Sequence, residues 1–186
     1  MTVDELMQDG VRRMDQAVEH TRNEFNTVRT GRASAALLDR IAIDYYGQET
    51  PLKQLATINV PEPRMLTIQP FDPGSLKQIE KAIQESDLGL TPSNDGKLIR
   101  LPIPQLTEER RKELVKVVRH LAEEGRIAVR NVRRDVMHNL KELVTKGDVG
   151  ADEEHRGEER LQKLTDEHVK TIDDALKHKE AEILEV

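Results

Sequence analysis

Residues 108–146, EERRKELVKVVRHLAEEGRIAVRNVRRDVMHNLKELVTK, decide the fold of this chain. The stretch contains no proline, and its apolar residues recur at intervals of three and four, as they do on one face of an α-helix. At 1.5 Å per residue a single helix of this length would span roughly 55 Å, far more than an ordinary globular helix. We therefore predict one long helix with an apolar stripe made of Leu114, Val118, Leu121, Ala128, Val132, Val136, Leu140 and Leu143.

The same stretch carries a row of basic residues on another side of the predicted helix. At about 100° per residue the row falls within about 60° of one line, directed away from the apolar stripe, with Glu123 as its main acidic interruption. A solvated face normally mixes signs so that i,i+4 pairs form. A mostly cationic row over several turns is typical of a helix that lies against phosphates, so we predict contact with RNA. The row consists of Lys112, Lys116, Arg119, Arg126, Arg130, Arg133, Arg134 and Lys141.

Charge is divided unevenly between neighbouring segments. The chain carries a net charge of −6, but residues 108–146 hold 11 basic and 7 acidic groups (+4), whereas residues 147–186 hold 6 and 13 (−7). One alternative is that a basic and an acidic helix merely attract each other across a bundle. Surface attraction of that kind is weak and screened by salt, and it leaves unexplained a basic row that points away from the packing face.

Composition limits the class of protein. With 186 residues the chain can hold one or two domains. The absence of cysteine excludes disulfides and thiolate metal sites, which fits a reducing compartment. The first twenty residues are interrupted by Asp4, Glu5 and Asp9, and no apolar run approaches the roughly 18 residues of a membrane span. We expect a cytoplasmic protein without a secretory signal or a membrane contact.

Two further helices are predicted, one near the start of the chain and one near its end. Residues 3–29 have an apolar seam with alternating steps of four and three, ended by Thr30-Gly31, with Gly31 as a candidate left-handed C-cap. Residues 152–183 form the last helix, after the break Lys146-Gly147-Asp148-Val149-Gly150. The first seam is made of Met7, Val11, Met14, Val18, Thr21, Phe25 and Val28, and the last of Leu161, Leu164, Ile172, Leu176 and Ile183. Long amphipathic helices cannot bury their stripes alone, so we predict a three-helix bundle.

A block of different residue composition lies between the first and second helices. All eight prolines and both tyrosines fall between Gly31 and Gln105. The block is predicted to contain strands at residues 41–46, 55–60, 65–68 and 97–103, with Gly47 in a turn, and a short helix at 75–86. This is an α+β domain of β/α/β type, large enough for a modest core of its own.

The predicted domain boundaries follow from this change in residue composition. The bundle takes residues 1–30 and 105–186, and the inserted domain takes residues 31–104. Two connections join them, so the junction would be a hinge with one easy axis. The predicted hinge residues are Thr30, Gly31, Pro102, Pro104 and Gln105.

No catalytic site, cofactor site or metal site is indicated. Gly96-Lys97 lacks the remaining residues of a P-loop, the histidines lack ligand spacing, and no nucleophile stands beside a base. Near the buried side of the last helix, His168 is expected to be a packed residue rather than a ligand. The run 152–154 is acidic, and we interpret it as decoration of a helix N-terminus rather than a metal site. Tyr45-Tyr46 could stack on bases, but neighbours on a strand point to opposite faces, which favours one core residue and one that covers the sheet.

Several segments together resemble the ribosome recycling factor family, almost from end to end. The most specific are Thr107-Glu108-Glu109-Arg110-Arg111 and Arg130-Asn131-Val132-Arg133-Arg134-Asp135. The other matching segments are residues 29–34, 37–39, 45–47, 51–52, 88–90, 100–102, 106 and 112. Departures are small: Ala35 stands where many members have proline, and Phe71 stands where a larger aromatic residue is frequent.

The resemblance implies an L-shaped protein, with an antiparallel three-helix bundle and a β/α/β domain inserted through a flexible hinge. It implies a non-enzymatic translation factor, expected to be a monomer, that binds in the intersubunit space of the terminated ribosome. Together with the GTPase elongation factor G it would split the ribosome, so that ribosome, mRNA and tRNA are recycled. The GTP would belong to the partner, so no cofactor is expected in this chain.

The resemblance also implies which residues contact large-subunit ribosomal RNA. Arg130, Arg133 and Arg134 occupy the matching motif, and the basic row adds Arg119 and Arg126. Near the hinge end the matching arginines are Arg29, Arg32, Arg110 and Arg111. An alternative of another class is a coiled-coil scaffold or chaperone whose helices bind proteins through apolar surfaces. That alternative predicts binding that is insensitive to salt, whereas RNA contact predicts an affinity that falls steeply with salt.

Overall fold

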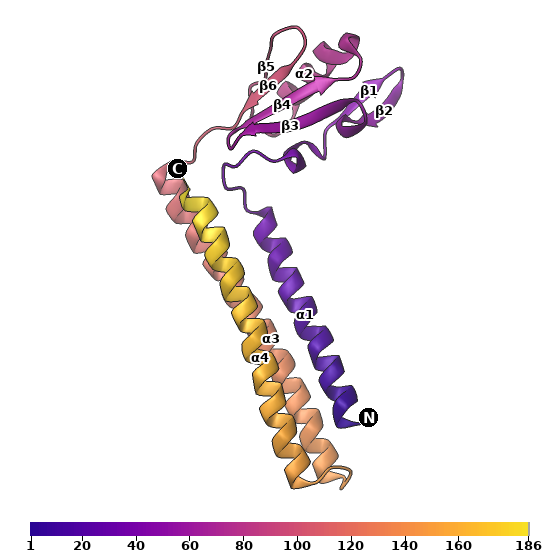
Figure 1. The fold of residues 1–186 in the computed structure, drawn as a ribbon, viewed down its shortest axis with the longest axis vertical. Coiled ribbons are helices and arrows are strands. Elements are labelled where there is room, and N and C mark those ends of the chain that lie inside the picture. Colours follow the sequence, from indigo (N-terminus) through magenta and orange to yellow (C-terminus); the bar gives the residue numbers. More distant parts are fainter. Residues whose placement is uncertain (186) are drawn as a thin grey trace. The chain divides into compact units, whose positions relative to one another are not determined.

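The structure is a computed structural model, and residues 1–185 are described here. The chain divides into two compact units. The helical unit comprises Met1–Arg29 and Thr107–Glu185, and the sheet unit comprises Thr30–Leu106 (Figure 1). The sheet unit is therefore inserted between the first helix and the remainder of the helical unit, as predicted from the prolines and tyrosines.

Within residues 1–185 the helical unit consists of three long helices that lie side by side (Figure 1). They are α1 (Val3–Thr27), α3 (Glu108–Thr145) and α4 (Ala151–Leu184). Pairs across the helix contacts show that α3 is antiparallel to both of the others. The pairs are Arg13–Asp135 and Thr21–Gly125 between α1 and α3, and Arg126–Asp173 and Arg119–Glu180 between α3 and α4. The predicted antiparallel three-helix bundle is confirmed.

Local capping explains where these helices begin and end. The side chain of Thr107 accepts a hydrogen bond from the backbone N–H of Arg110, so Thr107 is the N-cap of α3. At the other end of α3, Gly147 has φ +79°, and the N–H groups of Gly147 and Asp148 donate to Val144 and Leu143. This is a Schellman motif, which satisfies the last carbonyls of the helix.

The prediction that Gly31 caps the first helix is wrong. Helix α1 ends at Thr27, and its C-cap is Val28, whose extended backbone carries the chain out of the helix. Gly31 nevertheless has φ +75°, a conformation that favours glycine, but it uses this conformation in the segment that enters the sheet unit.

The apolar stripe of α3 differs in part from the predicted one. Leu121, Ala128 and Leu143 are half-buried, whereas Ala122, Gly125 and Val129 are fully buried. The helix packs against two neighbours, so its buried face is broader than a single seam, and small residues occupy the closest approach. The other predicted stripe residues, Leu114, Val118, Val132, Val136 and Leu140, are buried as expected.

All three helices meet at Gly125. A Cβ atom added there would lie 3.0 Å from Cγ2 of Thr21 in α1 and 3.2 Å from Cδ1 of Ile172 in α4, and it would also collide with the Thr21 hydroxyl. Thr21 is itself fixed, because its hydroxyl donates to the carbonyl of Ala17 at 2.9 Å. The absence of a side chain at Gly125 therefore sets how closely α3 approaches both partners.

Residues 56–102 of the described chain contribute a four-stranded antiparallel sheet in the order β3-β4-β6-β5. Its strands are β3 (Ala56–Glu62), β4 (Met65–Pro70), β5 (Ser93–Asn94) and β6 (Ile99–Pro102). A separate hairpin is formed by β1 (Ala42–Tyr45) and β2 (Gln48–Pro51). The remaining elements are α2 (Leu76–Glu85) and the short 3-10 segments Ala35–Leu38, Leu52–Gln54 and Pro73–Ser75.

The core of the sheet unit follows the alternation of its strands and the stripe of α2. Leu76, Ile79 and Ile83 lie on one side of α2 and are buried. They join the inward residues of β4 and β6 and the segments around the hairpin. The fully or nearly fully buried members are Leu38, Ile41, Ile43, Leu52, Leu55, Ala56, Leu66, Ile68, Leu76, Ile79, Ile83, Ile99 and Leu101.

Two strands differ from their predicted extents. Strand β2 was not predicted, because its sequence QETP is polar and lies on an exposed hairpin, so it shows no apolar alternation. Strand β3 continues through Pro61 to Glu62, which is tolerated because β3 is an edge strand and a register shift separates Asn59 from Glu62.

The last strand begins later than predicted, at Ile99 rather than Lys97. The side-chain carboxylate of Asp95 accepts hydrogen bonds from the N–H groups of Lys97 and Leu98 at 3.0 and 2.8 Å, and these bonds hold the preceding residues in a turn. The bond from Lys97, then that from Leu98, lowers the pKa of Asp95 below its ordinary value.

The expectation for the two tyrosines is correct for Tyr45 and wrong for Tyr46. Tyr45 packs against the sheet core, and its hydroxyl donates to Asp72 at 3.3 Å. Burial, followed by the charge of Asp72, raises the pKa of Tyr45. Tyr46 does not cover the sheet: it has φ +51°, forms the hairpin turn together with Gly47, and is 86% exposed.

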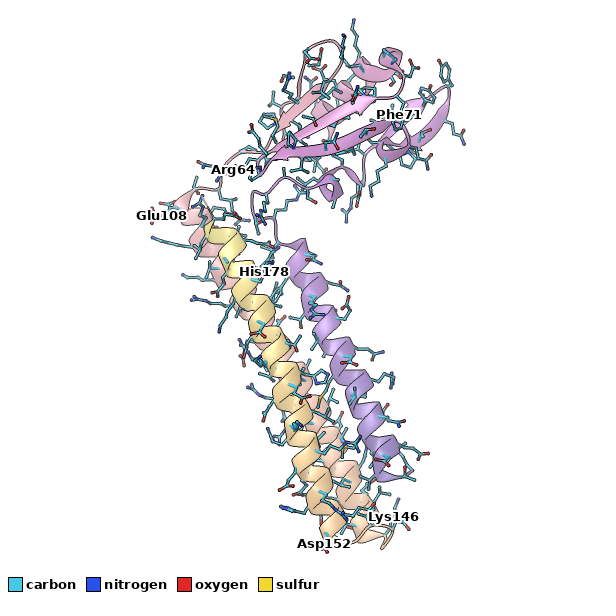
Figure 2. The ribbon with its side chains drawn as sticks, viewed as in Figure 1. Arg64, Phe71, Glu108, Lys146, Asp152 and His178 are labelled. Carbon is cyan, nitrogen blue, oxygen red and sulfur yellow. The ribbon has the colours of Figure 1, made fainter. Side chains whose placement is uncertain are left out.

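The β3–β4 turn holds both segments that enter and leave the sheet unit. The N–H of Ala33 donates to the carbonyl of Pro63 at 2.7 Å, and the N–H of Ile103 donates to the carbonyl of Arg64 at 2.8 Å. The guanidinium of Arg64 also lies against the side-chain amide oxygen of Gln105. Figure 2 shows Arg64 at the opposite end of the sheet unit from Phe71.

The close approach at Gly125 yields a stability prediction. Gly125→Ala improves helix propensity by about 1 kcal/mol, but its methyl group overlaps Thr21. We expect a net loss of about 1–2 kcal/mol in the free energy of unfolding, measured by urea denaturation. Adding Thr21→Ala removes the overlapping atoms and should recover part of that loss, so the two changes are non-additive. A single variant Gly125→Ala that is more stable than the parent chain would contradict the proposed close packing.

Candidate nucleic-acid interface

The exposed side of α3 carries most of the predicted basic row. Its side chains that face solvent are Lys112, Lys116, Arg119, Arg130, Arg134 and Lys141. Helix α1 covers a different side of α3, where Arg13 pairs with Asp135 at 2.6 Å. These six exposed residues form a cationic strip along α3. Figure 2 labels Glu108 and Lys146 at the two ends of this helix.

The prediction that the whole row points away from the packing face is wrong for Arg126. Its side chain is only 20% exposed and lies against α4, where Nε donates to Asp173 at 2.7 Å. Nη1 donates to Glu123 at 2.8 Å. Burial alone would lower the pKa of Arg126, but the hydrogen bonds that its guanidinium donates to Asp173 and Glu123 outweigh this effect and raise that pKa. Arg126 is therefore a charged residue whose charge is already balanced.

Arg119 also meets α4. Its Nε donates to Glu180 at 2.7 Å, although the arginine itself remains exposed. The alternative considered from sequence, attraction between a basic and an acidic helix, is thus correct for Arg119 and Arg126. The acidic partners escaped sequence analysis because Asp173 and Glu180 become neighbours of α3 only once the antiparallel register is set.

The motif that contains Arg130, Arg133 and Arg134 is held differently. Arg130 lies 3.8 Å from Glu123, a long contact for an ion pair. Arg133 and Arg134 each donate to a neutral amide oxygen, that of Gln162 at 3.2 Å and that of Asn131 at 2.6 Å, respectively. Amide acceptors orient a guanidinium without cancelling its charge, so this part of α3 keeps cationic groups in fixed positions.

The arginines predicted near the hinge lie apart from this motif. Arg110 pairs with Glu113 at 2.9 Å in the first turns of α3, roughly 30 Å along the helix from Arg130. Within residues 1–185 the Nε of Arg111 is buried and has no hydrogen-bond partner. Arg29 is exposed just beyond α1, and Arg32 is exposed in the sheet unit. Within the helical unit, Arg110 and Arg111 are therefore separate from the Arg130 motif.

An apolar residue also lies on the cationic strip. Ile127 is 46% exposed, one residue after Arg126 and on the same side of α3 as Arg130 and Arg134. Ile127 was not predicted from the sequence because it lies outside the apolar stripe, although an apolar residue in that position is itself a signal of a contact surface. The strip consequently offers both phosphate-binding cations and a contact for an uncharged surface.

Among the histidines, His168 has a structural role. His168 is 13% exposed, and its ring nitrogens meet the carbonyl of Leu164 at 2.6 Å and the carboxylate of Asp15 at 2.7 Å. This confirms a packed histidine that links α4 to α1. In the part of the chain that the structure describes, no group of three or more His, Cys, Asp or Glu side chains could hold a metal ion.

Among the described helices, none is long and apolar enough to cross a membrane. The acidic run 152–154 lies in the first turn of α4, where carboxylates are favoured by the helix dipole. Its position agrees with the interpretation made from sequence.

Comparisons with known proteins extend over nearly the whole chain. The family model described as ribosome recycling factor matches residues 21–184. A ribosome-recycling factor from Rubrobacter xylanophilus is 59% identical over 180 residues, covering 97% of this chain and 97% of that protein. A ribosome-recycling factor from Synechocystis sp. is 57% identical over 173 residues, covering 93% of this chain and 95% of that protein.

Solved structures agree with the sequence comparisons. A solution structure of the ribosome recycling factor has a TM-score of 0.75 and 42% identity, covering 100% of this chain and 99% of that one. A second structure is described as models for the T. thermophilus ribosome recycling factor and the E. coli elongation factor G bound to the E. coli post-termination complex. It has a TM-score of 0.65 and 46% identity, covering 99% of this chain and 100% of that one. The resemblance noted from the sequence is confirmed, and the chain belongs to the ribosome recycling factor family.

Proposed function

We propose that this chain is a non-enzymatic translation factor that helps to split the post-termination ribosome, so that ribosome, mRNA and tRNA are reused. The observation that carries the proposal is the cationic strip of α3 together with Arg133, in which Arg133 and Arg134 are oriented by neutral amides. Membership of the ribosome recycling factor family and the related structure bound to a post-termination complex support it. The helical unit would bind large-subunit ribosomal RNA in the intersubunit space.

The proposed action depends on the rigidity of the helical unit. Helix α3 runs unbroken from Glu108 to Thr145, so at 1.5 Å per residue it is about 57 Å long. It can therefore transmit a displacement along its length. The partner would be the GTPase elongation factor G, which would push on the sheet unit and turn the helical unit as a lever against the contacts between ribosomal subunits.

The two chain connections would supply the hinge. Pro102 is the last residue of β6 and pairs with Met65, so it belongs to the sheet itself. Gly31 and Gln105 lie in the segments beside the β3–β4 turn. We propose that the angle between the two units changes in the connections close to these residues, where few backbone hydrogen bonds constrain the chain.

A protein-binding scaffold remains the alternative of another class, but the structure offers it little support. The exposed apolar residues of α3, Val117 and Ile127, lie roughly 15 Å apart along the helix and are flanked by charged residues. They do not form the continuous apolar surface that a clamp requires.

The proposed RNA contact predicts a salt-sensitive loss on removal of Arg133. Arg133→Ala should weaken co-sedimentation with vacant ribosomes on the order of tenfold, and it should reduce the slope of log affinity against log salt by roughly 0.7–1. A matched control is Arg22→Ala, which removes an exposed arginine of α1. Equal effects of both substitutions, or binding by the parent chain that is independent of salt, would favour the scaffold alternative.

Arg126 should behave in the opposite way. Arg126→Ala removes a part-buried guanidinium that links α3 to α4, so we expect the free energy of unfolding to fall by about 1–2 kcal/mol. Thermal unfolding measures this effect, and Arg133→Ala provides the comparison. A variant Arg126→Ala with unchanged stability and strongly reduced ribosome binding would assign Arg126 to the RNA contact instead.

The hinge predicts that recycling and binding can be separated. Gly31→Val places a β-branched side chain at φ +75°, with its Cβ 3.2 Å from Cγ of Leu106, so the connection is strained. We expect disassembly of post-termination complexes with elongation factor G and GTP to slow more than ribosome affinity falls. The control is Gly89→Val, at φ +67° with nothing within 4 Å of the added Cβ. Equal losses of binding and disassembly in Gly31→Val would contradict a separate hinge role.

A further inference from the structure

Three arginines of α3 recur one heptad apart on the side that approaches α4: Arg119, Arg126 and Arg133. The first two meet carboxylates at 2.7 Å, and those carboxylates, Glu180 and Asp173, are also one heptad apart on α4. Because the helices are antiparallel, one more heptad along each helix sets Asp166 at the position that corresponds to Arg133. The repeating register therefore predicts a third neutralised arginine.

The structure departs from this register at the third position. Arg133 donates from Nη1 to the side-chain oxygen of Gln162 at 3.2 Å, one turn along α4 from Asp166. The amide nitrogen of the same glutamine donates to Oδ1 of Asp166 at 2.9 Å. One glutamine side chain thus stands between the guanidinium and the carboxylate and satisfies both.

The orientation of the Gln162 amide follows from its two partners. A guanidinium only donates hydrogen bonds and a carboxylate only accepts them, so the amide must turn its oxygen to Arg133 and its nitrogen to Asp166. Both Gln162 and Asp166 are exposed, and together with Lys163 they line an open depression on α4. The bond to Gln162 uses one of the five N–H donors of the arginine, so the group is oriented while most of its donors remain for a ligand.

We propose that Gln162 is a positioning residue that keeps Arg133 available for a phosphate. It does so by holding the guanidinium with a neutral acceptor and by engaging the carboxylate that would otherwise pair with it. Along the α3–α4 contact, Arg119 and Arg126 then stabilise the bundle, whereas the charge of Arg133 remains available to a ligand. This inference rests on the proposed function, because it assigns a role to Gln162 in the same RNA contact.

The test compares the parent chain, Gln162→Ala and Gln162→Ala/Asp166→Asn by co-sedimentation with vacant ribosomes, at salt concentrations from about 50 to 200 mM. Without Gln162, Arg133 can pair with Asp166. We expect Gln162→Ala to weaken binding and to reduce the salt slope by roughly the loss of one phosphate contact, 0.7–1. Asp166→Asn in the double variant removes the competing charge and should restore both quantities.

A matched control separates a specific rescue from a general change of charge. Gln162→Ala/Glu167→Gln removes one exposed carboxylate next to Asp166 in sequence, and it has the same net charge as the rescued variant. It should remain as weak as Gln162→Ala alone. A structural role of Gln162 would instead lower the unfolding temperature of every variant that lacks it, and Asp166→Asn would not restore binding.

The outcomes distinguish this inference from the function on which it rests. Normal, salt-dependent binding by Gln162→Ala together with weak binding by Arg133→Ala would overturn the role of Gln162 and leave the RNA contact intact. Failure of Asp166→Asn to rescue, or equal rescue by Glu167→Gln, would also overturn it. Binding by the parent chain that does not change with salt would overturn the RNA contact, and the role of Gln162 with it.

Discussion

The helical unit depends on a close approach of three helices at Gly125. Each helix is amphipathic and gains most of its stability from packing, so its apolar stripe must be covered by its neighbours. A glycine at the crossing lets α3 approach Thr21 of α1 and Ile172 of α4 at the same level. Once that level is set, the antiparallel register of α3 and α4 follows, and it brings Arg126 opposite Asp173.

This register divides a row of similar arginines into two groups. Arg119 and Arg126 lie opposite carboxylates of α4, and their charges are balanced within the protein. Arg133 and Arg134 are held by neutral amides, which fix their geometry and preserve their charge. The residue type is the same throughout, but the partner decides whether an arginine stabilises the bundle or is available to a polyanion.

The sheet unit shows how an inserted domain can be joined to a helical unit by two chain segments. Its own core is complete, since α2 and the inward residues of β4 and β6 bury one another. The β3–β4 turn binds the entering segment through Pro63 and the leaving segment through Arg64. Backbone hydrogen bonds therefore tie both segments to the sheet. Under the proposed mechanism, fewer residues of the two segments are then free to bend.

The sequence by itself determined the helices, the insertion and the family, because these depend on periodicity, on proline and glycine, and on motifs that are local along the chain. The apolar spacing of residues 108–146 predicts α3 almost to the residue, and Thr107 was recognisable as its cap. The sequence did not reveal the exposed strand β2 or the turn position of Tyr46, since neither has an apolar signal. Only the tertiary structure decided which arginines meet carboxylates, because pairs such as Arg126–Asp173 join residues far apart in sequence through a register that packing sets.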